Sequence, residues 1–171
     1  MMKYYFPHVD SCFVCSDNIP TGLHLKSYYE DGVVKLDCFA SESIGGYIGI
    51  VHGGIIATML DEVMTWAAFA FSEHMRLFFT REMNIKYKKP VVVNNSYIAL
   101  AEYHSERKGI IFIKGSFVDT CGGVYVQSKA SYMPMDMERT FNGLKASRFD
   151  KNLTYHPKIL KFFKDLHIDK P

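Results

Sequence analysis

The chain lacks the features that would assign it to several large classes of protein. Its 171 residues include only 4 cysteines, and the N-terminus has no basic segment followed by an apolar run, as a secretory signal requires. We therefore expect a cytoplasmic protein with reduced cysteines. Charge of one sign is not in excess either, since 20 basic against 18 acidic residues leave a net charge of +2. This balance favours neither a nucleic acid nor a membrane surface as partner.

Long hydrophobic runs are also missing, apart from one at Ile55 to Phe71. Its 17 residues reach only the lower limit for crossing a bilayer. Asp61 and Glu62 at its middle would each cost on the order of 2.5 kcal/mol or more in lipid. The run therefore predicts a helix buried in protein. Its polar residues, Thr58, Asp61, Glu62 and Thr65, recur at helical spacing and so share one face.

Alternating apolar and polar residues predict six strands around this helix. Two of them, Leu23 to Tyr29 and Val33 to Ala40, flank Asp31-Gly32, which is a typical hairpin turn. The other four follow the helix at about 80–90, 96–105, 110–119 and 124–133. The turns between them are too short for parallel crossovers. We therefore expect an α+β domain in which an antiparallel sheet wraps around one central helix.

Two other regions have a distinct character. The stretch 44–54 is rich in glycine, which suits a loop whose backbone approaches a ligand closely. Residues 134–171 form an extension beyond Pro134, which ends the last strand. There, Ile159, Leu160, Phe163 and Leu166 recur at helical spacing, so we expect a short helix packed on the body. The predicted organisation is one domain, with a body of residues 1–133 and an extension of residues 134–171.

Several of these elements together resemble the hotdog-fold acyl-CoA thioesterases, in particular the branch like the phenylacetate-pathway (PaaI-like) thioesterase. The matching elements are His-Gly-Gly at 52–54, Asp61 nine positions after the histidine, the strand at 80–90, and the strands that follow to about residue 133. The patterns C-F-V-C at 12–15 and N-I-P-T-G-L at 18–23 are similar to those of one subgroup. The resemblance covers roughly residues 12 to 133.

The resemblance implies roles for specific residues. Asp61 would be the general base or nucleophile, and the Gly53 N–H would polarise the thioester carbonyl. Thr80 would position water, as a hydroxyl residue does in some members. Some members also have an asparagine six positions before the histidine, where this chain has Gly46. The substrate would be an acyl-CoA, with neither a cofactor nor a metal, and the chain would form homodimers that in many members pair into tetramers.

The residues supply the same chemistry without the resemblance. Thioester hydrolysis needs a site for the developing oxyanion and a group that activates water. Gly53 and Gly54 stand where the helix begins, and its first N–H groups lack partners. Asp61 is the first candidate for base or nucleophile, and His52 would orient the substrate. We assign contacts with the substrate to Gly54, Glu62, Thr65 and Lys88.

Distance along the helix adds a constraint. At a rise of 1.5 Å per residue, Asp61 lies roughly 10 to 13 Å from the N–H groups at the helix start, too far for both to act on one carbonyl. If two copies pair about a two-fold axis with antiparallel helices, Asp61 of one copy can stand beside Gly53 of the other. We therefore expect an obligate homodimer, and possibly a dimer of dimers, with composite sites.

Each of these residues also has a structural alternative. Asp61 and Glu62 could pair with Arg or Lys across a subunit interface, which is the favoured role for Glu62. The glycines could serve turn geometry, and His52 could be a structural loop residue. By strand alternation Thr80 groups with Glu82 and Asn84 rather than with Met83. Thr58 and Thr65 could bond back to helix carbonyls. Solvation alone could explain the basic residues Lys86, Lys88, Lys89, Arg107 and Lys108.

Cys12 and Cys15 raise the question of a metal or redox site. A structural zinc site requires four ligands, and Cys38 and Cys121 fall at separate strand and turn positions, so metal binding is disfavoured. No strand–helix unit of the thioredoxin kind adjoins the pair. Two other functions stay open for the chain, a non-catalytic acyl-CoA sensor and a hotdog hydratase or dehydratase. The C-terminal extension has no DNA-binding motif and the hydratase motif is missing, so hydrolysis is favoured.

Overall fold

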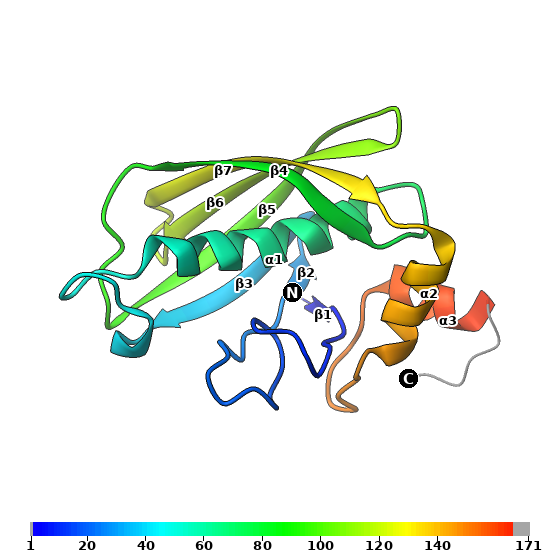
Figure 1. Ribbon diagram of the computed structural model, residues 1–171, viewed down its shortest axis with the longest axis horizontal. Helices are drawn as coiled ribbons and strands as arrows, with labels where there is room; N and C mark the ends of the chain where they lie inside the picture. Colours follow the sequence, from blue (N-terminus) through cyan, green and yellow to red (C-terminus); the bar gives the residue numbers. More distant parts are fainter. Residues whose placement is uncertain (1, 166–171) are drawn as a thin grey trace.

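The computed structural model describes residues 2–165, which form a seven-stranded antiparallel sheet with one long helix against it (Figure 1). The sheet order is β1-β2-β3-β5-β6-β7-β4. The elements are β1 (Tyr4–Tyr5), β2 (Tyr28–Glu30), β3 (Val33–Ala40), the 3-10 helix η1 (Glu42–Ile44), α1 (Gly53–Phe71), β4 (Phe78–Tyr87), β5 (Asn95–Arg107), β6 (Ile110–Asp119), β7 (Val124–Pro134), α2 (Met137–Ala146) and α3 (Pro157–Asp165). The predicted antiparallel sheet around a central helix is confirmed.

Helix α1 is the core element that the apolar run predicted. Its length and composition alone would allow it to cross a membrane, but a core helix passes the same test. Here it packs against β3 to β7, and its buried residues are Ile56, Met59, Leu60, Val63, Met64, Ala67, Ala68 and Phe69. At Gly115 of β6 a Cβ atom would stand 2.5 Å from Met64 Sδ. A side chain at position 115 would therefore require the Met64 side chain to move.

The first hairpin differs in part from the prediction. Its turn is as expected, since Asp31 and Gly32 have φ angles of 51° and 81°, the left-handed values that a two-residue hairpin turn requires. The first strand is shorter, however, and begins at Tyr28 rather than at Leu23. Leu23 N donates to Phe13 O, and Leu25 N donates to Val14 O. The alternating residues therefore pair with the N-terminal loop instead of extending the sheet.

The two edges of the sheet differ in their cover. At one edge, Tyr5 of β1 forms a bridge to Tyr155, so the C-terminal extension lies alongside. At the other edge, β4 pairs with β7 only, and within residues 2–165 no further strand lies along its other side. An open edge presents a row of unpaired backbone groups to a potential partner.

The C-terminal extension packs on the end of helix α1 (Figure 1). Helix α3 includes the predicted Ile159 and Phe163, which are buried, but Leu160 is 40% exposed and Leu166 lies outside the described residues. Helix α2 was not predicted. It starts at an Asp136 cap that accepts a hydrogen bond from Arg139 N at 2.8 Å, a local signal that the sequence does contain.

Candidate active site

Asp61 and Thr80 meet between helix α1 and strand β4. Thr80 Oγ1 donates a hydrogen bond to Asp61 Oδ1 at 2.6 Å. The expectation from strand alternation, that Thr80 shares a face with Glu82, is wrong. The pairing of β4 with β7 shifts register between Thr80 and Glu82, and this bulge turns Thr80 to the helix side, where Met83 also packs. The carboxylate therefore has a fixed orientation, with Oδ2 left for another partner.

A second hydroxyl faces this pair from strand β7. Tyr132 is fully buried, and its hydroxyl has no hydrogen-bond partner with acceptable geometry within the described residues. Burial raises the pKa of Tyr132, and the negative charge of Asp61 raises it further. The phenol therefore stays protonated and can donate. The sequence analysis did not single out Tyr132, so its place beside Asp61 was missed.

His52 caps the start of helix α1. Gly54 N donates to His52 Nδ1 at 3.0 Å, while Ile55 N donates to His52 O at 3.0 Å. Because Nδ1 accepts, the neutral ring carries its proton on Nε2, which is free to donate to a substrate. Among residues 2–165, the Gly53 N–H has no acceptor. Of the two glycines, Gly53 is thus the one whose N–H remains available for an oxyanion.

Neighbouring residues hold this helix start in place. Tyr87 Oη at the end of β4 donates to Gly53 O at 2.7 Å, a contact that sequence reasoning missed. Gly46 packs directly on the histidine, since a Cβ atom there would stand 3.1 Å from His52 Cα and 3.3 Å from its Cδ2. A side chain at position 46 would therefore require His52 to shift slightly.

The predicted substrate contacts divide into two places. Lys88 and Gly53 line the same surface hollow of about 380 Å³ together with Tyr47 and Tyr87. Glu62 and Thr65 instead line a separate apolar cavity of about 210 Å³ on the flank of the helix. Thr58 Oγ1 bonds back to Gly54 O at 2.9 Å, as the structural alternative expected.

Glu62 has an environment that the sequence did not indicate. Within the described residues no Lys or Arg pairs with it. Its carboxylate instead accepts from Trp66 Nε1 at 3.0 Å and from Cys12 Sγ at 3.8 Å. Burial and the nearby Cys12 raise the pKa of Glu62 to about 8. The Cys15 thiol and backbone N–H groups lower the pKa of Cys12 to about 6, while the pKa of Cys15 is raised.

The two halves of the predicted site remain apart within one chain. Gly53 opens helix α1, and Asp61 follows eight residues later, which corresponds to about 12 Å along the axis. Among the described residues, none forms hydrogen bonds with both Gly53 and Asp61. The open β4 edge lies beside both, because Thr80 and Tyr87 belong to that strand.

Comparison with known proteins follows this geometry. Residues 48–108 match the family model of the thioesterase superfamily, and this segment carries His52, Gly53, Asp61 and Thr80. The chain has the hotdog fold of thioesterase-superfamily structures. The N-terminal Cys-x-x-Cys loop and the C-terminal extension lie outside the matched segment. The comparison with curated proteins gives no match.

Solved structures support the fold at low sequence identity. Zebrafish thioesterase superfamily member 2 is 20% identical, with 63% of this chain and 78% of that chain covered at a TM-score of 0.57. A Streptococcus mutans protein bound to acetyl CoA is 14% identical, with 63% and 84% covered at a TM-score of 0.57. A hypothetical thioesterase from Streptococcus pneumoniae with coenzyme A is 16% identical, with 62% and 83% covered at a TM-score of 0.56. The predicted hotdog fold is confirmed.

Proposed function

We propose that this chain is a thioesterase-superfamily protein that hydrolyses an acyl-CoA thioester to a free acid and coenzyme A. The observation that carries the proposal is that helix α1 holds both groups. It presents the Asp61 carboxylate, which accepts a hydrogen bond from Thr80, and a Gly53 N–H that has no acceptor among residues 2–165. These are the two groups that acyl transfer to water requires. The matched family segment and the CoA-bound neighbours of the same fold support the substrate class.

In the proposed reaction, the Gly53 N–H of one copy donates to the thioester oxygen as negative charge develops there. Asp61 Oδ2 of the other copy takes a proton from water, whose oxygen attacks the carbonyl carbon. Alternatively, Oδ2 attacks that carbon itself and forms a mixed anhydride, which water hydrolyses to the free acid after coenzyme A has left. The carbon–sulfur bond then breaks, and coenzyme A leaves as its thiolate. Thr80 holds Oδ1, which keeps Oδ2 aimed at the reacting carbon. His52 Nε2–H would orient the substrate carbonyl.

The proposal includes a homodimer joined at the β4 edge. Pairing two β4 strands antiparallel would satisfy their free backbone groups and would set the two α1 helices antiparallel. Four apolar residues near the helix start, which we call the N-terminal patch, are exposed in one chain: Tyr47 at 87%, Ile48 at 104%, Tyr87 at 49% and Val92 at 43%. Exposed apolar surface of this kind favours burial against a second copy. Pairing of dimers into tetramers remains part of the proposal.

Coenzyme A would approach through the hollow beside Gly53. Lys88 and Lys89 line this hollow, which places two ammonium groups within reach of phosphates. The assignment to the PaaI-like branch rests on the resemblance of the 12–23 and 52–61 motifs. The panel of thioesters described next identifies the acyl group of the substrate.

A panel of acyl-CoA thioesters assayed for released thiol tests the proposal. Wild-type protein should release free thiol from at least one member of the panel. Asp61→Asn should lower kcat by about 10² to 10⁴, the usual contribution of a positioned base. Glu138→Gln removes an exposed carboxylate from α2, away from the β4 edge, and should leave the rate unchanged. Acyl-CoA binding without thiol release would favour the non-catalytic sensor, and a fully active Asp61→Asn would contradict the assigned base.

A further inference from the structure

Cys12, Cys15 and Glu62 converge on the flank of helix α1, in a cluster that the proposed reaction does not use. The two sulfur atoms and a carboxylate oxygen of Glu62 all lie within 4.8 Å of one another. Cys12 comes from the N-terminal loop and Glu62 from the helix, 50 residues apart in sequence. We propose that these three side chains bind a single Zn²⁺ ion.

The spacing of the ligand atoms suits tetrahedral zinc. Zinc–sulfur bonds of about 2.3 Å and zinc–oxygen bonds of about 2.0 to 2.2 Å place such ligand atoms roughly 3.5 to 3.8 Å apart. Cys12 Sγ and Glu62 Oε2 already stand 3.8 Å apart. The largest separation in the cluster, 4.8 Å at most, exceeds the ideal by about 1 Å, which side-chain rotation can close.

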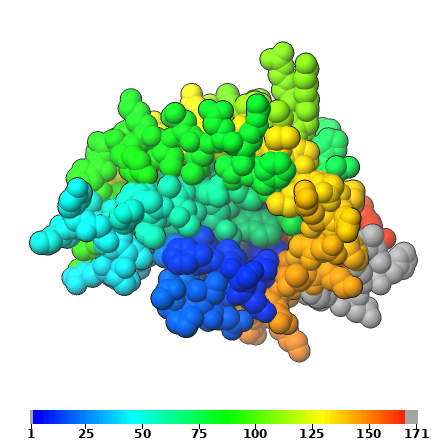
Figure 2. All heavy atoms as spheres, in the orientation of Figure 1, coloured from blue at the N-terminus to red at the C-terminus, as the bar shows by residue number. Residues whose placement is uncertain are grey.

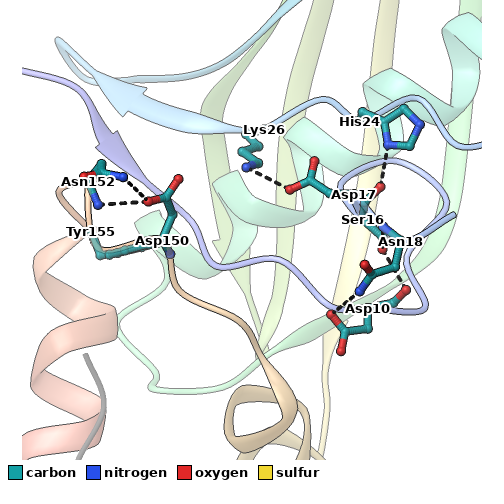
Figure 3. Close-up of polar contacts among 9 residues, drawn as sticks. All are labelled: Asp10, Ser16, Asp17, Asn18, His24, Lys26, Asp150, Asn152 and Tyr155. Carbon is teal, nitrogen blue, oxygen red and sulfur yellow. Dashed lines mark hydrogen bonds and ion pairs between the residues drawn. The ribbon is translucent and has the colours of Figure 1, made fainter. Parts of the chain in front are cut away.

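The cysteine loop is built before any ion binds. Cys15 N donates to Cys12 Sγ at 3.4 Å, and an N–H directed at sulfur favours the thiolate, the form that ligates metal. Further along the loop, Ser16 Oγ donates to Asp10 O at 2.7 Å and Asn18 Nδ2 donates to Asp10 Oδ1 at 3.1 Å (Figure 3). The loop therefore does not have to fold when it takes up a cation.

Glu62 is oriented like a metal-bound carboxylate. Trp66 Nε1 donates to Glu62 Oε1 at 3.0 Å, which leaves Oε2 directed at the cysteines. An outer hydrogen bond of this kind is typical of ligating carboxylates. Within the described residues no Lys or Arg forms an ion pair with Glu62. Zinc would supply the positive charge that these anionic ligands otherwise lack.

Two sulfurs and one oxygen favour zinc over the harder Mg²⁺ and Ca²⁺, which prefer oxygen alone. Three protein ligands leave the fourth position open. It would face the apolar cavity of about 210 Å³, whose wall includes all three ligands together with Thr65 and Phe78. The ion would tie the N-terminal loop to α1 one residue from Asp61. Sequence reasoning sought the missing ligands among the cysteines, whereas the third one is a carboxylate brought in by the fold.

Titration of the full-length wild-type protein tests the site directly. After chelation under reducing conditions, the protein should bind one equivalent of Co²⁺ per chain with a thiolate-to-cobalt charge-transfer absorption, and Zn²⁺ should displace it. Trp66 is the only tryptophan and contacts Glu62, so bound Co²⁺ should quench its fluorescence. Neither measurement depends on thioesterase activity or on a variant that folds.

Substitutions then assign the ligands. Cys12→Ser and Cys15→Ser should abolish the absorption, and Glu62→Gln should weaken Co²⁺ binding by at least about tenfold. Cys38→Ser and Cys121→Ser change a buried and an exposed thiol elsewhere and should bind as wild type does. The proposal is overturned if wild type binds no Co²⁺ or Zn²⁺, or if the Cys12→Ser protein keeps the absorption. It is also overturned if the Trp66 fluorescence does not change when Co²⁺ binds. A Cys12–Cys15 disulfide without metal binding would overturn it equally.

Discussion

The two ends of helix α1 meet very different surroundings. At its C-terminal end the chain covers the helix with its own N-terminal segment and with α2 and α3, whereas the loop at its N-terminal end protrudes from the body (Figures 1 and 2). Lys158 Nζ donates to Phe69 O at 2.5 Å and to Ser72 O at 2.6 Å, so carbonyls at the covered end have a donor. At the open end, the Gly53 N–H has no acceptor among residues 2–165, and Ile48 is fully exposed.

The two ends differ in whether their contacts are formed within one chain or are available to another molecule. The covered end satisfies its polar groups and buries its aromatic side chains, as in the stack of Phe6 on Trp66 at 4.8 Å. The open end keeps an N–H, an apolar patch and a sheet edge free. Open sheet edges and exposed apolar patches tend to bind other molecules, which favours a role of this end in binding a substrate and a second copy.

Ile48→Asp should produce the largest effect, and only at the open end. Because Ile48 is 104% exposed in the single chain, the change should leave the stability of the monomer alone. An unpaired carboxylate buried between subunits costs about 3 to 5 kcal/mol, so the dimer dissociation constant should rise at least about a hundredfold. Sedimentation equilibrium measures this constant. Leu160→Asp, at the covered end, should dimerise normally, and an unaffected Ile48→Asp dimer would place the interface elsewhere.

Lys158→Met should destabilise the covered end by about 2 to 3 kcal/mol, because two carbonyls would lose a charged donor at a helix C-terminus. Part of that loss is offset, since burial lowers the pKa of Lys158 to about 8 and the charged ammonium is therefore costly to bury. Urea unfolding gives the change in free energy. Lys161→Met, which alters an exposed lysine on the same helix, is the matched control, and equal stability of the two variants would contradict the capping role.

His156 should make the covered end sensitive to acid. Burial, and then the charge of Lys158, lower the pKa of His156 from 6.5 to about 4. As pH falls from about 6.5 to 4, His156 becomes protonated in the unfolded chain while it stays neutral in the folded chain. The free energy of unfolding should therefore fall by about 1 to 3 kcal/mol. The loss should be absent above pH 6.5 and smaller in His156→Gln. His104→Gln, at an exposed site on β5, should follow the wild-type curve.

Thr80→Val should have the smallest effect, about a tenfold fall in kcat with little change in stability. The valine keeps the shape of the side chain but removes the hydrogen bond to Asp61 Oδ1, and about 1.4 kcal/mol corresponds to a tenfold change in rate. Thr80→Ser retains the hydroxyl and should restore the rate. If valine and serine variants hydrolyse acyl-CoA at the wild-type rate, Thr80 does not position the carboxylate.

Most of the fold could be predicted from regular patterns of apolar and polar residues. The helix was placed within two residues of its observed bounds, and β6 was placed at its observed bounds, because local periodicity reports burial directly. The start of β2 was predicted too early because Leu23 and Leu25 pair with the N-terminal loop, which alternation cannot distinguish from a sheet. Helix α2 was not predicted because it has few apolar positions and its main local signal is the Asp136 N-cap.

The site was predictable only as far as it is local. Asp61 and the glycines at the helix start follow from one helix, whereas the capping role of His52 was not predicted. The orientation of Thr80 depends on a bulge, and the partners of Glu62 come from a loop 50 residues away, so neither can be read from spacing. Long-range contacts of this kind are decided by tertiary packing rather than by sequence period.

The division between the two ends is tested most directly by complementation between two inactive variants. Gly53→Pro removes the N–H at a helix position that tolerates proline, while Gly53→Ala keeps it and fits, since its Cβ would stand 3.5 Å from Tyr87. An equal mixture of Gly53→Pro and Asp61→Asn chains, allowed to exchange subunits, should regain about a quarter of the wild-type activity, because half the dimers would each contain one intact composite site. Heterodimers that form but remain inactive would show that Asp61 does not serve the Gly53 of its partner.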